Sequence, residues 1–163
     1  MSDDKGGNDG LKLRHRLLLR LIHPLQFLQR GMTLGVRAAC FNAKGEVFLV
    51  RHTYVPGWYL PGGGVERGET VIEAIHKEIR EEGHLEAISA PVLFHVYHNR
   101  RVNIRDHVLL YRIDVRQTAP RLPDHEIAEC GFFALDHLPE GATKATLLRL
   151  AELRGEIETA DFW

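Results

Sequence analysis

Cysteine is scarce in this chain, with Cys40 and Cys130 the two present among 163 residues. Two cysteines this far apart are too few for a disulfide scaffold or a zinc site. A single bridge is the alternative, but we expect free buried thiols in a reducing compartment. Long hydrophobic runs are missing too, because no stretch approaches the roughly 18 apolar residues of a membrane span. The first residues are acidic, unlike a secretory signal. We therefore expect a cytoplasmic protein without a membrane span.

An excess of charge of one sign is also missing. The 21 Lys and Arg residues face 22 Asp and Glu residues, which gives a net charge of −1 with histidine neutral. A general nucleic-acid coat normally carries a basic excess, so that class is excluded. With 44% hydrophobic and 26% charged residues, the composition also excludes a disordered tail, a coiled coil and a collagen-like fibre. The length fits one domain with a hydrophobic core.

The charges that are present are segregated along the chain. Residues 11–31 hold five Lys or Arg and no acid, whereas residues 66–86 hold seven Glu and three basic residues. Residues 1–10 are polar and glycine-rich, which predicts disorder. Residues 11–31 predict a basic, amphipathic helical segment that Pro24 kinks or divides. Such a segment could pack on the domain, join two subunits in a homodimer, or rest on an anionic membrane surface.

From Met32 onward, the hydrophobic pattern alternates between strand-like and helix-like stretches. It predicts strands over 34–41, 46–51, 91–98 and 107–115, a short strand at Phe132 and Phe133, and helices over 70–82 and 143–154. A glycine-rich loop over 57–68 precedes the first helix, and a polar loop over 117–126 precedes the short strand. Together these elements predict one α/β (α+β) domain over 32–163, with a central mixed sheet covered by helices.

The helix expected over 70–82 places carboxylates beside its apolar face. At about 100° per residue, Glu78, Glu81 and Glu82 fall within an arc of about 100°. This arc adjoins the apolar stripe of Ile72, Ile75 and Ile79. Like charges at this spacing repel unless a cation compensates them, and Mg²⁺ or Mn²⁺ prefers such oxygen ligands. Glu69 approaches from the glycine loop and could complete the cluster. A purely solvated acidic face would instead keep its carboxylates away from the stripe.

Other sites that combine glycines or carboxylates fit this segment less well. A phosphate-cradling loop of the Gly-x-x-x-x-Gly-Lys-Ser/Thr kind is absent, and so is the Gly-x-Gly-x-x-Gly dinucleotide fingerprint. Paired carboxylates for glycoside cleavage remain open by residue type, although three carboxylates on one helix suit metal ions better. The segment therefore predicts a site where a metal ion meets pyrophosphate and activates water.

Residues 63–85 resemble the Nudix box, Gly-x5-Glu-x7-Arg-Glu-U-x-Glu-Glu-x-Gly-U, where U is a bulky aliphatic residue. The matching positions are Gly63, Glu69, Glu78, Ile79, Glu81, Glu82 and Leu85. The resemblance to the Nudix hydrolase (MutT-like) family implies an α/β/α sandwich. It also implies Mg²⁺- or Mn²⁺-dependent hydrolysis of the pyrophosphate bond in a small molecule, a nucleoside diphosphate linked to another moiety.

The resemblance also implies roles for individual residues. The implied catalytic residues are Lys77, Glu78, Glu81 and Glu82, and the implied metal ligands are Glu69, Glu78, Glu81 and Glu82. Within the box, Glu78 is the candidate general base. An acidic residue from outside the box often joins such sites, and Glu126 and Glu129 are the candidates here. For both residues, a plain surface carboxylate is the alternative.

Substrate binding is expected from the glycine loop and from a basic turn. The candidates are Gly62 and Gly63 in the loop, Arg100 and Arg101 in the turn, and Glu126. Aromatic residues that could stack on a base are Tyr54, Trp58, Phe94 and Tyr97. Turn arginines are usually solvated and strand aromatics usually lie in the core, so a structural role is the alternative for each.

Two box positions depart from the family pattern. Lys77 stands where the family has Arg, and His84 stands where it has Gly, with Gly83 one place early. A lysine holds carboxylates less firmly than the planar fork of arginine does. At the second position, either Gly83 ends the helix early or His84 adopts a left-handed conformation. These departures motivate a second hypothesis, a non-catalytic nucleotide-sensing or protein-interaction module on the same fold.

Overall fold

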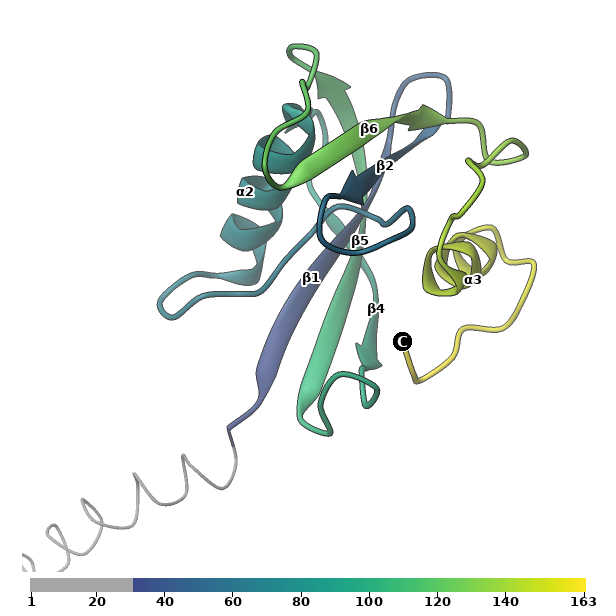
Figure 1. The fold of residues 1–163 in the computed structure, drawn as a ribbon. Coiled ribbons are helices and arrows are strands. Elements are labelled where there is room, and N and C mark those ends of the chain that lie inside the picture. Colours follow the sequence, from purple (N-terminus) through teal and green to yellow (C-terminus); the bar gives the residue numbers. More distant parts are fainter. Residues whose placement is uncertain (1–30) are drawn as a thin grey trace, which may run out of the picture. The chain divides into compact units, whose positions relative to one another are not determined.

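A mixed β-sheet with a helix on each face is the framework of the chain (Figure 1). The computed structural model describes residues 31–163. The predicted disorder over 1–10 and almost all of the basic segment over 11–31 lie outside the described residues. Within them the elements are β1 Thr33–Phe41, β2 Val47–His52, α2 Val71–Gly83, β3 Leu85–Ala87, β4 Val92–His98, β5 Asp106–Gln117, β6 Ile127–Phe133 and α3 Lys144–Leu153.

The strands follow the order β3-β5-β1-β2-β6, and β4 also pairs with β5. β1 runs parallel to β5, and the other pairs are antiparallel. Because β5 is 12 residues long, its edge away from β1 accommodates both β3 and β4, one after the other. The sheet is therefore mixed, as the sequence predicts.

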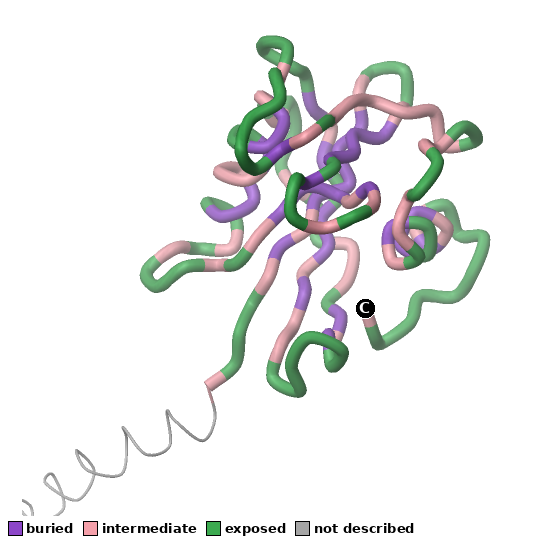
Figure 2. Tube along the Cα trace, viewed as in Figure 1, coloured by how far each residue is buried: buried purple, intermediate pink, exposed green. Residues whose placement is uncertain are grey.

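The two faces of the sheet carry separate buried clusters. Along β1, Val36, Ala38 and Cys40 face α2, whereas Ala39 and Phe41 face α3, because successive side chains of a strand point to opposite faces. Figure 2 shows the buried positions along the middle strands and on parts of both helices. The expected α/β/α sandwich is confirmed.

The glycine loop packs against β1 around Val36 and Ala38. The backbone N–H of Val36 donates to the carbonyl of Gly63, and that of Ala38 donates to the carbonyl of Pro61, both at 2.9 Å. Gly62 has a φ of +145°, and a Cβ atom there would collide with the carbonyl oxygen of Val36. Only glycine fits so close to a neighbouring backbone, so the loop sequence is required by its packing against β1.

Both ends of α2 are capped by its own sequence. Thr70 and Glu73 form a reciprocal capping box at the N-terminus. At the C-terminus, His84 adopts a left-handed conformation with φ 50° and ψ 39°, and its N–H donates to the carbonyl of Arg80. Gly83 is the last helical residue, and a Cβ atom there would lie 2.7 Å from the ring of Phe48, so the packing favours glycine at this position. Of the two alternatives for the helix end, the left-handed histidine is the one observed.

Three sequence expectations need correction. β3 was not anticipated, because a strand of three residues is too short to show a period. β6 spans seven residues, more than the predicted pair of phenylalanines, because its half-exposed pattern with Glu129 and Gly131 hides the alternation. Ile72 is 38% exposed and lies outside the core. Ala74 contributes to the buried face of α2, which shifts that face away from Ile72 and centres it on Glu82.

No helix among residues 31–163 is long and apolar enough to cross a membrane.

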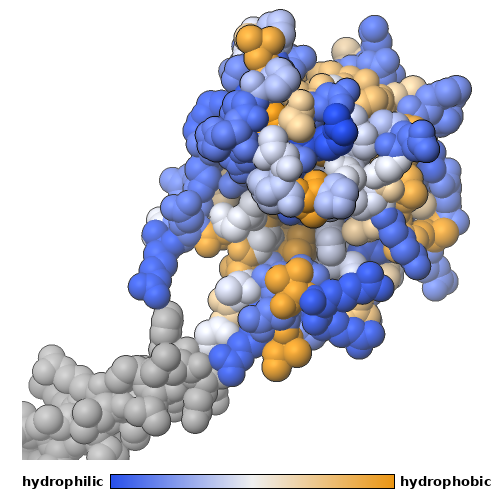
Figure 3. All heavy atoms as spheres, in the orientation of Figure 1, coloured by the Kyte–Doolittle hydropathy of each residue, from blue (hydrophilic) through white to orange (hydrophobic). Residues whose placement is uncertain are grey.

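On the face drawn in Figure 3, strongly hydrophilic side chains lie mainly around the margin, while paler and apolar side chains occupy the middle. The large apolar residues are gathered mostly in the two clusters on either side of the sheet.

Candidate active site

Glu82 on α2 is a buried carboxylate with 4% of its surface exposed. Its Oε2 accepts a hydrogen bond of 2.9 Å from the backbone N–H of Gly62 in the glycine loop. Burial raises the pKa of Glu82 to about 8, while the Gly62 N–H and the Arg37 guanidinium oppose this rise. A buried carboxylate without a close cationic partner is costly, which makes this position suited to a bound cation.

Glu126 and His52 lie beside Glu82. Ligand atoms of these three residues all lie within 4.8 Å of one another. The exposed Glu126 comes from the loop before β6, and that loop is joined to the end of β2 because the N–H of Thr53 donates to the Glu126 carbonyl at 2.9 Å. Among residues 31–163, this is the one group of three histidine, cysteine or acidic side chains close enough to hold a metal ion.

Glu78 lies one turn before Glu82 on α2 and contacts the glycine loop. A Cβ atom on Gly63 would collide with the Glu78 carboxylate, so the first glycine of the box leaves room for this side chain. Burial raises the pKa of Glu78, and the negative charges of Glu81 and Glu126 raise it further. Glu78 therefore faces the same group of carboxylates as Glu82.

Arg37 on β1 carries a positive charge that acts on Glu78 and Glu82. Its guanidinium donates to the carbonyls of Leu60 at 3.0 Å and Gly62 at 2.8 Å, which holds the glycine loop in place. The positive charge lowers the pKa of both Glu78 and Glu82. Arg37 also lines two cavities of about 290 and 320 Å³. It thus connects the carboxylates with the space where a substrate could lie.

Lys77 holds the far end of the glycine loop on α2. Its Nζ lies 3.0 Å from Oε1 of Glu69 and 3.3 Å from Oε1 of Glu66. Glu69 also accepts the backbone N–H of Glu66 at 3.0 Å, and this bond and Lys77 together lower the pKa of Glu69. The structure thus places Glu69 with Lys77 rather than in the group around Glu82, and a metal-binding role for Glu69 stays a prediction.

The remaining predicted acidic residues are divided between the site and the surface. Glu81 is exposed, and its carboxylate lies near enough to Glu78 to raise the pKa of that residue. Glu129 forms an ion pair of 2.6 Å with Arg51 on the neighbouring strand. Of the two candidates from outside the box, the structure therefore brings Glu126 to the site and leaves Glu129 in a surface ion pair.

The two turn arginines have different surroundings. The guanidinium of Arg100 lies 4.0 Å from the centre of the Phe162 ring. Arg101 lines the cavity of about 290 Å³ together with Arg37, Tyr59 and other residues. Arg101 is thus the one of the two that shares a cavity with a residue of the carboxylate site.

The aromatic candidates mostly belong to the cores. Trp58 and Tyr97 are buried in the cluster under α3, and Phe94 packs against it. Tyr54 is 70% exposed, and its ring centre lies 5.1 Å from that of His52. Tyr54 is therefore the candidate that remains available for stacking beside the site.

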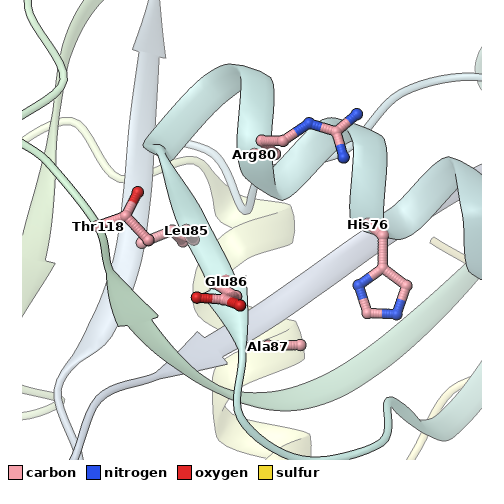
Figure 4. Close-up of a pocket in the computed structure, with 6 residues that line it drawn as sticks. All are labelled: His76, Arg80, Leu85, Glu86, Ala87 and Thr118. Carbon is pink, nitrogen blue, oxygen red and sulfur yellow. The ribbon is translucent and has the colours of Figure 1, made fainter.

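A further cavity of about 480 Å³ lies away from the carboxylates, between α2 and β3 (Figure 4). It is lined by His76 and Arg80 of α2, by β3 and by Thr118, and none of the acidic residues around Glu82 takes part. This cavity is therefore separate from the candidate active site.

Sequence reasoning missed His52 and Arg37. His52 is 8% exposed, and burial together with the charge of Arg37 lowers its pKa, so the imidazole is neutral. A signal was available for Arg37, which is a charged residue between two apolar residues of a predicted strand. For His52 there was none, because a histidine at a strand end is common and its neighbours come from distant segments.

The fold and the site together define an α/β/α domain whose glycine loop and acidic helix meet at a buried carboxylate. A family model described as NUDIX domain matches residues 31–151. The chain belongs to the Nudix family.

Three similar proteins illustrate this membership. The 8-oxo-dGDP phosphatase NUDT18 of Mus musculus is 29% identical over 131 residues, which are 77% of this chain and 40% of that protein. The crystal structure of a MutT NUDIX hydrolase from Burkholderia pseudomallei has a TM-score of 0.62 and 27% identity, and covers 74% of this chain and 97% of that one. The crystal structure of an ADP-ribose pyrophosphatase from Streptococcus suis has a TM-score of 0.57 and 26% identity, and the match covers 78% of this chain and 94% of that one. The chain spans less than half the length of the curated relatives it matches.

Proposed function

We propose that this protein is a divalent-metal-dependent pyrophosphohydrolase that cleaves the pyrophosphate bond of a nucleoside diphosphate linked to another moiety. The observation that carries the proposal is Glu82, a buried carboxylate that lies beside Glu78 and Glu126 under the glycine loop. The names of the similar proteins include substrates as different as 8-oxo-dGDP and ADP-ribose, which have a diphosphate in common. The proposal therefore names the bond and not one substrate.

The donor atoms of the site fit Mg²⁺ or Mn²⁺. Glu82 and Glu126 offer oxygen atoms close together, and burial raises the pKa of Glu82, so a bound cation would stabilise its charged form. Glu82 and Glu126 would hold the ion, with Glu78 and Glu81 adjacent on α2. When bound, the ion would neutralise phosphate charge and lower the pKa of a coordinated water.

The other residues would place the substrate and move the proton. Glu78 is half-buried with a raised pKa, which suits a general base that takes a proton from the attacking water. Arg37 and Arg101 line one cavity and would bind the phosphates there. Arg37 also holds the loop carbonyls, so binding of substrate and the shape of the loop are coupled through one side chain.

The experiment is a screen of nucleoside diphosphate derivatives with Mg²⁺ and with Mn²⁺, followed by Glu82→Gln on the best substrate. Loss of a direct metal ligand is expected to lower kcat by about 100-fold or more. Glu86→Gln is the matched control, because Glu86 follows α2 closely but pairs with Arg116 on the surface. Equal loss in both variants, or undiminished turnover in Glu82→Gln, would contradict the proposal.

The same screen tests the non-catalytic module. Binding across the panel without turnover would favour it over the enzyme. The structure gives this alternative little support, because Lys77 makes ion pairs with two loop carboxylates and His84 caps α2 without moving a carboxylate. Neither departure from the box removes a donor from the site.

A further inference from the structure

His52 is a buried histidine whose ring has no hydrogen-bond partner in the part of the chain that the structure describes. Its side chain is 6% exposed, and among residues 31–163 nothing bonds to its Nδ1. Its Nε2 lies 3.6 Å from Oε1 of Glu82, which is longer than a hydrogen bond. Buried polar groups are nearly always satisfied, so an imidazole in this state calls for an explanation.

The local structure directs this ring at the carboxylates. Alternation along β2 puts His52 on the same face as Phe48 and Val50, which pack under α2. The register between β2 and β6 shifts between Arg51 and His52, and such bulges often re-aim a side chain. The ring is flanked by aromatic rings of the following loop, at centroid distances of 5.1 Å from Tyr54 and 5.8 Å from Tyr59.

We propose that His52 supplies a nitrogen ligand to the cation bound by Glu82 and Glu126, and that this nitrogen makes the site prefer Mn²⁺ or Co²⁺ to Mg²⁺. The inference rests on the proposed metal-dependent function and deepens it. Imidazole suits transition metals, whereas Mg²⁺ prefers a shell made of oxygen atoms. A site with a fixed imidazole among its donors therefore discriminates between these ions.

The positions of the three donors agree with this role. Ligand atoms at about 2.0 to 2.2 Å from one metal ion lie at most about 4.4 Å apart. The atoms of His52, Glu82 and Glu126 lie within 4.8 Å of one another, so a small closing movement brings all three donors within reach of one ion. Glu126 is exposed and can make that movement, whereas His52 and Glu82 are fixed by burial.

Metal binding by the full chain without substrate tests the inference. Electron spin-echo modulation of bound Mn²⁺ detects a directly attached ¹⁴N, and labelling histidine with ¹⁵N changes that signal without altering the fold. We expect nitrogen coupling in the unsubstituted protein and its loss in His52→Gln. Mn²⁺ binding should weaken by about 10- to 100-fold in that variant, while Mg²⁺ binding changes by a much smaller factor.

His107→Gln is the matched control. Among residues 31–163 the buried Nδ1 of His107 also has no hydrogen-bond partner, but its ring stacks on His98 at 5.1 Å and is not part of the group formed by His52, Glu82 and Glu126. Its substitution should leave the nitrogen coupling and both metal affinities unchanged. Loss of coupling in His107→Gln rather than in His52→Gln would overturn the assignment.

The outcomes separate this inference from the proposed function. Mn²⁺ bound without nitrogen coupling in the unsubstituted protein overturns the role of His52 and leaves the hydrolase proposal standing. Mn²⁺ bound through nitrogen, with no hydrolysis of any diphosphate in the panel, supports His52 as a ligand and contradicts the hydrolase. If His52→Gln fails to fold, the ¹⁵N-labelled protein still shows whether a histidine binds the ion, and His52→Asn takes the place of the glutamine variant in assigning that histidine.

Discussion

Glu82 on α2 and Glu152 on α3 are two glutamates buried to the same extent, each with 4% of its surface exposed, under opposite faces of the sheet. Glu152 is fully partnered. It pairs with Arg149 at 2.6 Å, accepts the hydroxyl of Tyr97 at 2.7 Å and accepts the N–H of Ala160 at 3.1 Å. Among residues 31–163, Glu82 accepts one backbone N–H, lies 3.6 Å from the His52 ring and forms no ion pair with a lysine or arginine.

The difference separates a structural carboxylate from a functional one. Glu152 and Arg149 join α3 to β4 and to the last residues of the chain, since Arg149 also donates to the carbonyl of Phe162 at 2.9 Å and lies 4.2 Å from the Tyr97 ring centre. The Glu152 carboxylate, with three such partners, has no capacity left for a ligand. An unsatisfied buried carboxylate destabilises the fold, and such groups are found at functional sites.

Removing the partner of Glu152 should have the largest effect. Arg149→Met leaves a buried carboxylate without its cation, and we expect a loss of about 3 to 5 kcal/mol in the free energy of unfolding. Chemical denaturation measures this loss, and the activity of the folded fraction should stay unchanged. Arg154→Met, which breaks the more exposed pair with Glu156, should cost at most about 1 kcal/mol. Equal losses of unfolding free energy in the two variants would contradict the distinction between the buried pair and the exposed pair.

The pH dependence of stability should reveal the unsatisfied state of Glu82. Its pKa is about 8 in the folded protein and near the ordinary 4.5 when unfolded. The folded state therefore keeps a proton that the unfolded state releases, and metal-free protein should lose stability as pH rises from about 4.5 to about 8. The loss should amount to a few kcal/mol, since each pH unit between the two pKa values is worth about 1.4 kcal/mol. Denaturation across this pH range in EDTA measures it.

The Glu82→Gln variant tests whether Glu82 itself causes this pH dependence of stability. The variant has no carboxylate to titrate at this position, so its stability should fall less between the same pH values. A pH slope as steep as that of the unsubstituted protein would show that another group is responsible.

Substituting the first glycine of the box should damage activity more than stability. A Cβ atom in Gly63→Ala collides with the Glu78 carboxylate and displaces it, and a misplacement of about 1 Å can lower the rate by about 100-fold. Gly64→Ala is the matched control, because nothing lies within 4 Å of the Cβ position there. Steady-state kinetics of the two variants should differ in kcat, and similar values would contradict the close approach of loop and helix.

The smallest effect is expected at Lys77, which positions the loop without touching the buried carboxylates. Lys77→Met should lower kcat by about 10-fold, and the change in unfolding free energy should be about 1 kcal/mol, because the pair with Glu66 is exposed and the pair with Glu69 is partly exposed. Lys77→Arg should retain activity or raise it, since an arginine can hold both loop carboxylates. Equal losses in the two variants would show that the ammonium group itself is required.

Much of the architecture could be predicted because it depends on local patterns. The α2 helix was predicted to within one residue at each end, because its apolar spacing is helical and Thr70 and Gly83 mark its limits. The mixed sheet was predicted because strand-like and helix-like stretches occur together along the chain. For the departure at His84, the sequence left two outcomes open, and the structure shows the left-handed histidine. The glycine at position 83 is explained by Phe48, a distant residue that leaves no room for a side chain there.

By itself the sequence determined the acidic helix, the glycine loop and the carboxylates that α2 presents together, because all of these follow from helical spacing and backbone sterics. Tertiary structure decided which carboxylate is buried away from solvent. Glu82 lies in the middle of the buried face of α2, Arg37 and His52 approach it from β1 and β2, and Glu126 arrives from a loop more than 40 residues away. Desolvation and charge compensation depend on such distant neighbours, which no local pattern encodes.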